Sequence, residues 1–354
     1  MAKLFDISDW AEQSWYNTGG TRNKKVYLNP GDGELYYFKQ SFKKGKRDYK
    51  HEFWSEIIAS EVGKTLEFDV LEYHIALRGE VVGCICKSMI REGEELVEGG
   101  KYLQAYDNTF KPEDIKQRHQ YTLNLILAAL YSFDKEKHYK ELAETIVFDA
   151  IIGNSDRHQE NWAIINTHST LTEGLAHLEK GLEAGKLEGL PNWMLNFVKK
   201  FYTEKGQMRR DLKSARLLMP KQTRFAPIYD SGCSFGRELD TVRVQAMLLN
   251  ETEVKNYISR GLAEIHWGES KISHFEFIHR LLENNVLSRH IDAALSRALN
   301  LFDEKRIKHI VFSIDQPLKD LANPNILPLE RKELVVKLLT LRIEKLRMLH
   351  SQTT

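Results

Sequence analysis

Residues 151–165 read IIGNSDRHQENWAII, a polar loop between two apolar segments. This pattern predicts a buried helix that ends near Gly153, then a polar loop, then a short strand over residues 162–165. Polar side chains between two buried elements are held in place from both ends, as a catalytic loop requires. The segment is therefore the first candidate for a functional site.

Within this loop, Asp156 precedes Asn161 by five residues. Phosphoryl transfer needs a carboxylate that orients the attacking hydroxyl and accepts its proton, and it needs an oxygen ligand for magnesium nearby. An Asp-x4-Asn loop followed by a strand supplies both groups. His158 could orient the loop through a hydrogen bond to a backbone carbonyl. Asp and Asn are also common in ordinary turns, so the spacing alone does not decide the function.

A second acidic residue follows an apolar strand that we expect over residues 225–229. This strand leads Asp230 into the turn Asp230-Ser231-Gly232, in which Gly232 is free to take a positive φ. Kinases place a second metal-binding carboxylate at such a strand end, in an Asp-x-Gly turn. Asp230 is therefore a second candidate metal ligand.

Upstream, Lys39 ends a predicted strand over residues 35–39, where its ammonium group can pair with phosphate. The helix predicted over residues 51–64 carries Glu56, which could hold that lysine in an ion pair. Glu52 on the same helix is the rival partner. A strand lysine and a helix glutamate in this order are typical of kinases.

Turn-forming residues divide the N-terminal part into hairpins. The first turn is NPGDG at residues 29–33, and the second is Arg78-Gly79-Glu80. Before the first hairpin, Gly19 and Gly20 could bring backbone N–H groups onto phosphates, although a Gly-Gly pair most often marks only a turn. The strands expected around the two turns cover residues 26–28, 35–39, 70–77 and 81–87.

The chain after Gly100 is mostly helical in pattern, and a stretch rich in Gly and Glu between Met89 and Gly100 marks the expected boundary. The sequence thus predicts an α+β protein with a β-rich N-lobe (residues 1–90) and a large helical C-lobe (residues 91–354). The order of glycine turn, lysine strand, glutamate helix, Asp-x4-Asn loop and Asp-x-Gly turn is that of a kinase. The helices expected cover residues 115–131, 141–152, 275–283, 291–301 and 329–350.

The composition sets limits on partners and location. Among 354 residues, 51 basic side chains nearly balance 50 acidic ones, so bulk charge does not indicate nucleic acid or an anionic membrane. Three cysteines are too few for a disulfide framework, and Cys84 and Cys86 read as structural residues of an apolar strand. We expect a cytoplasmic protein, because no secretory signal and no apolar run of about 18 residues is present.

Two segments carry a family resemblance. GNSDRHQENW (residues 153–162) resembles the catalytic loop of HipA-like serine/threonine kinases, which include smaller stand-alone members of the HipT and CtkA type. FAPIYDSG (residues 225–232) resembles their magnesium-binding turn. The similarity extends over NTGGTRNK, ELYYFKQS, FWSEIIAS and VVGCICKSMI. It implies a two-lobed protein-kinase-like fold and transfer of the γ-phosphoryl group of ATP to Ser or Thr of a cytosolic protein, with Mg²⁺ as cofactor.

The resemblance also implies roles for individual residues. The catalytic loop supplies Asp156 as the base, with His158 beside it, and the magnesium ligands are Asn161 and Asp230. Thr18 or Thr21 would be the site of autophosphorylation, and a helix-turn-helix antitoxin would be a partner. The resemblance implies that Gly19 and Gly20 bind ATP, as does Lys39, which has Glu56 as its partner. It also implies that Lys87, Ser88 and Met89 form the segment between the lobes whose backbone meets adenine.

Some alternatives stay open at this point. Asp156–Asn161 also matches the D-R-H-x-x-N loop of phosphoinositide kinases, so a lipid or small-molecule kinase is one rival, and a nucleotide-binding pseudokinase is another. Residues 166–222 form an insert with a helical pattern that is basic near Arg209-Arg210. A decorated hairpin loop and a platform for substrate or partner are equally compatible with it.

Overall fold

A computed structural model describes residues 1–14, 24–41, 43–44, 47–111, 119–170, 218–283, 286–321 and 325–353. The chain divides into two units. The first consists of Met1–Met89, Glu98–Ala163 and Ala226–Thr354, and the second of Ile90–Val97 and Ile164–Phe225. All residues of the candidate site that the structure describes belong to the first unit.

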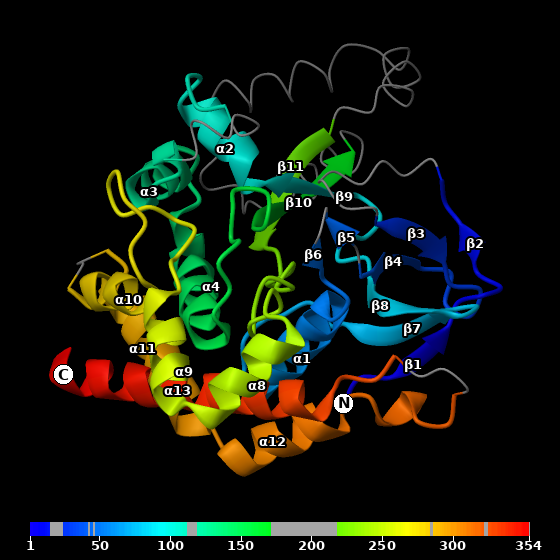
Figure 1. Ribbon diagram of the computed structural model, residues 1–354. Coiled ribbons are helices and arrows are strands. Elements are labelled where there is room, and N and C mark those ends of the chain that lie inside the picture. The colour runs from blue at the N-terminus through cyan, green and yellow to red at the C-terminus, as the bar shows by residue number, and fades with distance from the viewer. Residues whose placement is uncertain are drawn as a thin grey trace, which may run out of the picture. The chain divides into compact units, whose positions relative to one another are not determined.

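A six-stranded sheet, with strand order β1-β7-β8-β4-β3-β2, forms the N-terminal part of the first unit (Figure 1). Only β1 and β7 pair in parallel, and all other neighbours are antiparallel. The small hairpin β5–β6 (Lys43–Lys44 and Arg47–Asp48) pairs separately. The strands of the large sheet are β1 (Leu4–Asp6), β2 (Ala11–Glu12), β3 (Lys25–Leu28), β4 (Leu35–Gln40), β7 (His74–Arg78) and β8 (Val81–Lys87).

Both hairpins expected from the sequence are confirmed. In the first turn, Gly33 takes φ +70° and the Asn29 amide donates to the carbonyl of Glu34 (2.9 Å). In the second turn, Gly79 takes φ +59°. The strand expected from residue 70 begins only at His74, because Val70 instead forms an isolated bridge with Ile228.

The helix α1 (Glu52–Thr65) lies between this sheet and the helices of the C-terminal part (Figure 1). Every residue of α1 except Lys64 is buried, as expected for a helix with neighbours on all sides. It packs against β8 and α12. After α1, Phe68 stacks near Phe148 of α4, with ring centroids 5.1 Å apart. The element that carries Glu56 is therefore fixed in place by both lobes.

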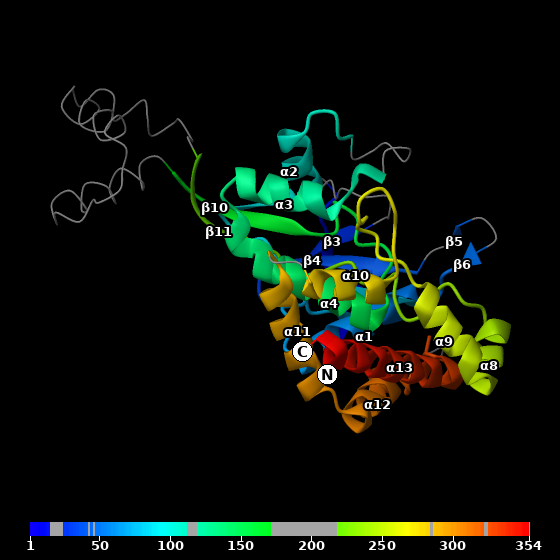
Figure 2. The same ribbon diagram turned by 90° about the vertical axis from the view of Figure 1, so that its left-hand side faces the viewer.

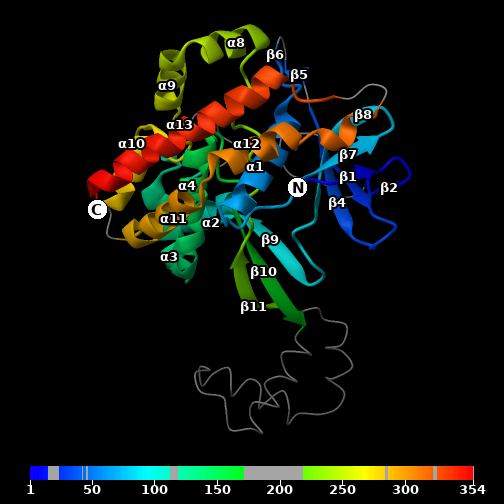
Figure 3. The same ribbon diagram turned by 90° about the horizontal axis from the view of Figure 1, so that it is seen from below.

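The C-terminal part of the first unit is helical, with α4 in contact with α10, α11 and α13. Figures 2 and 3 show the long helix α13 beside the later helices, and it contacts α4 and five of them, α8 to α12. The helices are α2 (Gly99–Tyr106), α3 (Leu123–Ser132), α4 (Tyr139–Ile152), α8 (Thr241–Leu249), α9 (Glu251–Arg260), α10 (His274–Leu282), α11 (Ser288–Leu301), α12 (Glu304–Ser313) and α13 (Leu329–Thr353), with 3₁₀ turns at Glu136–His138 and Gln316–Leu318.

The structure is thus α+β, with a small β-rich lobe and a large helical lobe, as the sequence predicts. Several expected elements differ in extent from those observed. α3 begins at Leu123, because the Thr122 side chain accepts from the Leu125 amide and caps the helix there, so residues 119–122 of the helix expected over residues 115–131 are not part of it. Residues 115–118 lie outside the described residues. Of the strand expected over residues 225–229, only Phe225 lies in a strand, because β11 (Leu218–Phe225) ends there and Ile228 forms only an isolated bridge. No described helix is both long and apolar enough to cross a membrane.

The second unit contains a three-stranded sheet with strand order β11-β10-β9. Its strands are β9 (Glu94–Glu98), β10 (Ala163–Thr170) and β11. β10 and β11 pair in antiparallel fashion, with a register shift between Thr167 and His168. Arg224 and Glu94 form an ion pair of 2.8 Å. Of the helical insert expected over residues 166–222, residues 171–217 lie outside the described residues. Its described ends, residues 166–170 and 218–222, are not helical but belong to β10 and β11.

Gly83 on β8 offers a test of how closely the two central strands approach. A Cβ at this position would lie 2.3 Å from the Lys39 carbonyl oxygen and 2.7 Å from the Phe38 ring. We expect Gly83→Ala to destabilise the fold by about 1–3 kcal/mol, because β4 must move away from β8. Urea unfolding measures this loss. Val81→Thr on the same strand, at an exposed position, should change stability by less than about 0.5 kcal/mol, and equal stability of both variants would contradict the close packing.

Candidate active site

The polar loop begins where α4 ends. Gly153 takes a left-handed conformation, with φ +71°, and its amide donates to the Asp149 carbonyl (2.8 Å). The Asn154 amide donates to the same carbonyl (3.1 Å). Glycine tolerates this conformation at a helix end without steric cost, so the sequence folds locally as predicted. The turn directs the following residues away from the helix and towards residues 226–237.

A buried charged network holds the loop against α4. Asp149, in the last turn of α4, accepts hydrogen bonds from Nε and Nη2 of Arg157 (2.9 and 2.8 Å) and from Nδ2 of Asn154 (2.9 Å). Arg157 is 2% exposed. Burial would lower the pKa of Arg157, but the Asp149 carboxylate, together with Asp230 and Tyr229, raises it above its ordinary value, so the guanidinium stays charged.

Arg157 also joins two segments that are far apart in the chain. Its Nη1 donates to the carbonyl of Asn161 (2.8 Å) and to the carbonyl of Tyr229, and its Nη2 contacts the Ser231 hydroxyl (3.3 Å). One guanidinium group therefore fixes the backbone at Asn161 and the residues on both sides of Asp230. Sequence reasoning gave Arg157 no role, yet it is the residue that brings the two candidate metal ligands towards each other.

Aromatic side chains hold the other side of the loop. The Tyr121 hydroxyl donates to the Arg157 carbonyl (3.0 Å) and accepts from the Trp162 indole (2.9 Å). The Tyr229 hydroxyl donates to the Glu160 carbonyl (2.7 Å). Tyr121 and Trp162 are almost fully buried, so the loop backbone is held by packing as well as by hydrogen bonds.

Within the loop, Nδ2 of Asn161 donates to the Asp156 carbonyl (2.6 Å). This bond fixes the amide group and leaves its oxygen as the atom that can bind a cation. The Asp156 carboxylate accepts from the Cys233 thiol (3.1 Å). The His158 ring accepts from the Glu160 amide (3.3 Å), so it bonds a backbone N–H and not the carbonyl that the sequence suggested.

The turn after Tyr229 differs from its predicted form. Asp230 itself takes the left-handed conformation, with φ +55°, whereas Gly232 does not have a positive φ. A Cβ on Gly232 would instead lie 3.1 Å from Glu52 and 3.2 Å from Glu56, so the glycine is needed for close packing against α1. Non-glycine residues in this conformation carry strain and are typical of functional sites.

Lys39, Glu56 and Asp230 form one buried cluster. The Lys39 ammonium lies 2.8 Å from Glu56 and 3.0 Å from Asp230, and Glu56 also accepts from the Ser231 amide (2.8 Å). Lys24 lies 3.7 Å from Asp230. Burial would lower the pKa of Lys39, but the carboxylates of Asp230 and Glu56 raise it well above its ordinary value. The lysine is therefore a fixed positive charge.

The structure places the remaining candidate residues as follows. Glu52, the rival partner of Lys39, instead pairs with Arg237 (2.5 Å). Lys87 ends β8, where it pairs with Asp32 and Glu34, and the Ser88 amide donates to the Leu35 carbonyl. Cys84 and Cys86 are buried free thiols on β8, in keeping with their structural interpretation. Thr18, Gly19, Gly20 and Thr21 lie outside the described residues.

The oxygens of Asn161 and Asp230 suit magnesium. Mg²⁺ is usually bound by one or two protein oxygens together with substrate phosphates, and not by a cage of protein ligands. In the part of the chain that the structure describes, no group of three or more His, Cys, Asp or Glu side chains could hold a metal ion by itself. The donor set therefore fits a metal that arrives with a phosphate-bearing substrate.

Comparison with solved structures shows which fold this is. The kinase CtkA of Helicobacter pylori, described as proinflammatory, matches with a TM-score of 0.70 at 18% identity, over 99% of this chain and 98% of that one. HipA of Shewanella oneidensis, in complex with HipB and operator DNA, matches with a TM-score of 0.43 at 10% identity, over 94% of this chain and 65% of that one. No protein-family model and no curated protein matches. The chain thus has the two-lobed kinase-like fold that the sequence predicts.

Proposed function

We propose that this chain is an ATP- and magnesium-dependent kinase that transfers a phosphoryl group to Ser or Thr of a protein. One observation carries the proposal. Lys39 contacts both Glu56 and Asp230 within 3.0 Å, while Arg157 bonds the backbone carbonyls of Asn161 and Tyr229 and the hydroxyl of Ser231, the residues on either side of Asp230. Strand lysine, helix glutamate, loop amide and turn carboxylate are the parts of a kinase centre. The similarity to the fold of CtkA supports this assignment.

In this proposal Lys39 binds the phosphates of ATP. Its ammonium is a compact charge that is held in position by Glu56, so its side chain loses little freedom when the nucleotide binds. The backbone of residues 87–89 would meet adenine, and Gly19 and Gly20 would cover the phosphates. Asn161 and Asp230 would hold the magnesium ion, which neutralises the charge on the phosphate oxygens.

Asp156 is the proposed base. The acceptor hydroxyl oxygen forms a bond to the γ-phosphorus while the bond from that phosphorus to its bridging oxygen breaks, and ADP leaves with the electron pair. The hydroxyl proton passes to the Asp156 carboxylate. The Cys233 thiol donates to one oxygen of this carboxylate, which helps to fix its orientation, and the other oxygen is the proposed proton acceptor.

The finer features implied by the resemblance belong to the same proposal. They are specificity for Ser and Thr, autophosphorylation at Thr18 or Thr21, a helix-turn-helix antitoxin partner and a cytoplasmic location. The domain division at residue 90 and the role of residues 166–222 stay predictions as well.

Asp230→Asn tests the metal assignment. We expect ATP to raise the melting temperature of the parent protein more in the presence of magnesium than in the presence of a chelator. A ligand that binds only the folded state stabilises it, by about 2.7 kcal/mol when the ligand is at a hundredfold excess over its Kd. The Asp230→Asn variant should lose most of the rise in melting temperature that depends on magnesium, since a neutral amide binds the ion more weakly than a carboxylate does. Asp320→Asn, at an exposed position of the C-lobe, is the control and should keep the full shift. No shift with ATP in the parent under either condition would end the kinase proposal.

A further inference from the structure

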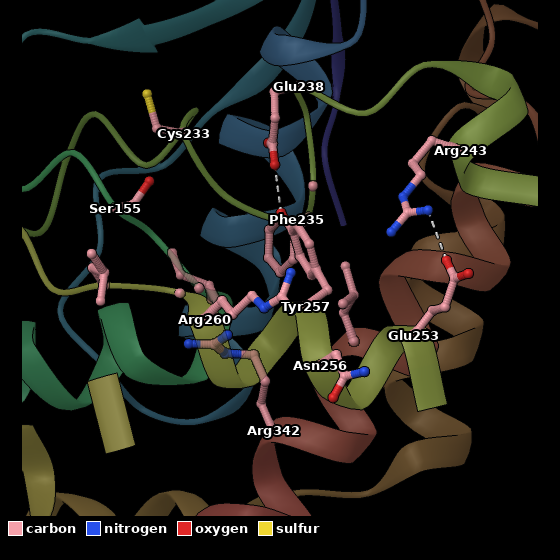
Figure 4. A pocket seen from close by; sticks show the side chains of 16 residues that line it. Ser155, Cys233, Phe235, Glu238, Arg243, Glu253, Asn256, Tyr257, Arg260 and Arg342 are labelled. Carbon is pink, nitrogen blue, oxygen red and sulfur yellow. Dashed lines mark hydrogen bonds and ion pairs between the residues drawn. The ribbon is translucent and has the colours of Figure 1, made fainter. Parts of the chain in front are cut away.

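A pocket of about 490 Å³ lies in the C-lobe between α8, α9, α13 and the ends of the two candidate-site segments (Figure 4). Ser155 and Cys233 line it. Ser155 directly precedes Asp156, and the Cys233 thiol donates to the Asp156 carboxylate. The pocket therefore lies next to the proposed base, on residues that the nucleotide site does not use.

Arg342 reaches from α13 into this pocket, although it is only 3% exposed (Figure 4). Its Nε donates to the Ala150 carbonyl (2.7 Å) and its Nη1 to the Ile258 carbonyl (3.5 Å). Its Nη2 is buried and makes no hydrogen bond. A Cβ on Gly153 would lie 3.2 Å from the guanidinium carbon, so this glycine leaves room for the charged group.

The charges that line the pocket do not balance. Three arginines (Arg243, Arg260 and Arg342) and two glutamates (Glu238 and Glu253) line it, an excess of one positive charge. Arg243 pairs with Glu253 (2.8 Å), whereas Glu238 accepts from the neutral Tyr257 hydroxyl (2.7 Å) (Figure 4). Among the residues that the structure describes, no carboxylate pairs with Arg342 or with Arg260, which also lines the pocket. Burial lowers the pKa of Arg342 to about 10, as expected for a buried cation without a counter-charge.

A structural role explains only part of this arrangement. Arg342 satisfies backbone carbonyls in the last turns of α4 and α9, where the helix dipoles favour a positive charge. That role accounts for Nε and Nη1. It does not account for the orphaned Nη2 or for the cavity beside it. A buried charge without a partner is costly, so a ligand that supplies the missing negative charge would bind well.

We infer that this pocket binds an anionic group of the acceptor substrate, a carboxylate or a phosphate, next to the hydroxyl that Asp156 serves. The inference rests on the proposed kinase function and gives its substrate class, namely segments that carry an acidic or phosphorylated residue near the target Ser or Thr. A guanidinium group bonds both kinds of oxyanion through paired N–H donors. Arg342 would fix the anion, and Arg260 would attract it at the exposed side of the pocket.

The binding step can be tested without any transfer reaction. Inorganic phosphate is titrated calorimetrically into the full chain carrying Lys39→Met, which removes the lysine of the nucleotide site. We expect Arg260→Glu to weaken phosphate binding roughly tenfold or more, since a charged hydrogen bond is lost and a repulsive charge is added. Lys255→Glu makes the same charge change on the same helix away from the pocket, and should weaken binding less than about twofold.

Equal phosphate affinity in the two variants, or no binding in the parent background, would overturn the anion site. Arg342→Met should abolish phosphate binding, and its melting curve shows whether this variant still folds. If it does not fold, the result for Arg260→Glu decides whether the pocket binds phosphate. Phosphate binding that depends on Arg260 in a chain without kinase activity would leave the anion site standing and would contradict only the proposed function.

The acceptor step is tested with Ser/Thr peptide libraries that fix Asp, phosphoserine or Lys at each flanking position. We expect the parent to prefer an anionic residue, and Arg260→Glu to raise KM for the preferred peptides roughly tenfold. The Asp and phosphoserine arms distinguish the two sources of the anion. The inference would be overturned if the parent phosphorylated peptides without preferring an anionic flanking residue, or if the parent and Arg260→Glu had equal KM values for the preferred peptides. Either result would leave the kinase function intact.

Discussion

Replacing Asp156 by asparagine is expected to slow phosphoryl transfer about 10²- to 10⁴-fold, the range over which a positioned base accelerates proton transfer. The amide has nearly the same shape as the carboxylate, and it can still accept a hydrogen bond from Cys233. It cannot take up the proton of the acceptor hydroxyl. The affinity for ATP should change little, because Lys39 and Asp230 are unaltered. Transfer is followed with labelled ATP under single-turnover conditions.

Glu160→Gln is the matched control for this prediction. It removes one negative charge from the same loop, whose contact with Tyr229 is made by the Glu160 backbone carbonyl and not by the side chain. We expect its transfer rate to stay close to that of the parent. A parental rate in Asp156→Asn would remove Asp156 as the base, and an equal loss in both variants would point to the charge of the loop instead.

Replacing Arg157 by methionine is expected to destabilise the protein by about 3–5 kcal/mol, the usual cost of removing one partner of a buried ion pair. Asp149 is 5% exposed, and its carboxylate would lose its cationic partner and retain the hydrogen bond from Asn154. The carbonyls of Asn161 and Tyr229 would lose their donor at the same time. Urea unfolding at neutral pH measures the loss.

A second substitution separates charge from packing. Adding Asp149→Asn to Arg157→Met removes the orphaned carboxylate and should recover part of the stability, so the two changes should be clearly non-additive. Arg280→Met breaks an exposed pair with Glu276 and should cost less than about 1 kcal/mol. Additive losses at Arg157 and Asp149 would show that the two side chains do not act as one unit.

The N-lobe could be predicted because its signals are local. Turn residues at 29–33 and 78–80 fix the two hairpins, and apolar spacing marks the helix of Glu56. The ion pair between Lys39 and Glu56 could be predicted because β4 and α1, which carry these residues, are close together in the sequence. The strand predicted over residues 225–229 is wrong beyond Phe225, because residues 226–229 are apolar for burial between other elements and not for pairing in a sheet.

The role of Arg157 could not be predicted, because spacing along the chain does not say which acid a buried arginine will meet. A signal was nevertheless present in the sequence. Asp149 is a single charged residue in the apolar segment IVFDAII at the end of α4. Buried charges are almost always paired, so this aspartate required a cation nearby. The left-handed conformation of Asp230 depends on tertiary packing and has no such signal.

The most direct test is a crystal structure with a non-hydrolysable ATP analogue and Mn²⁺ in place of Mg²⁺, in which the metal is located by anomalous scattering. We predict a metal ion at about 2.0–2.2 Å from the Asn161 amide oxygen and from an Asp230 carboxylate oxygen, with Lys39 on the phosphates. A nucleotide bound elsewhere in the chain, or a metal ion that touches neither Asn161 nor Asp230, would contradict the proposed centre.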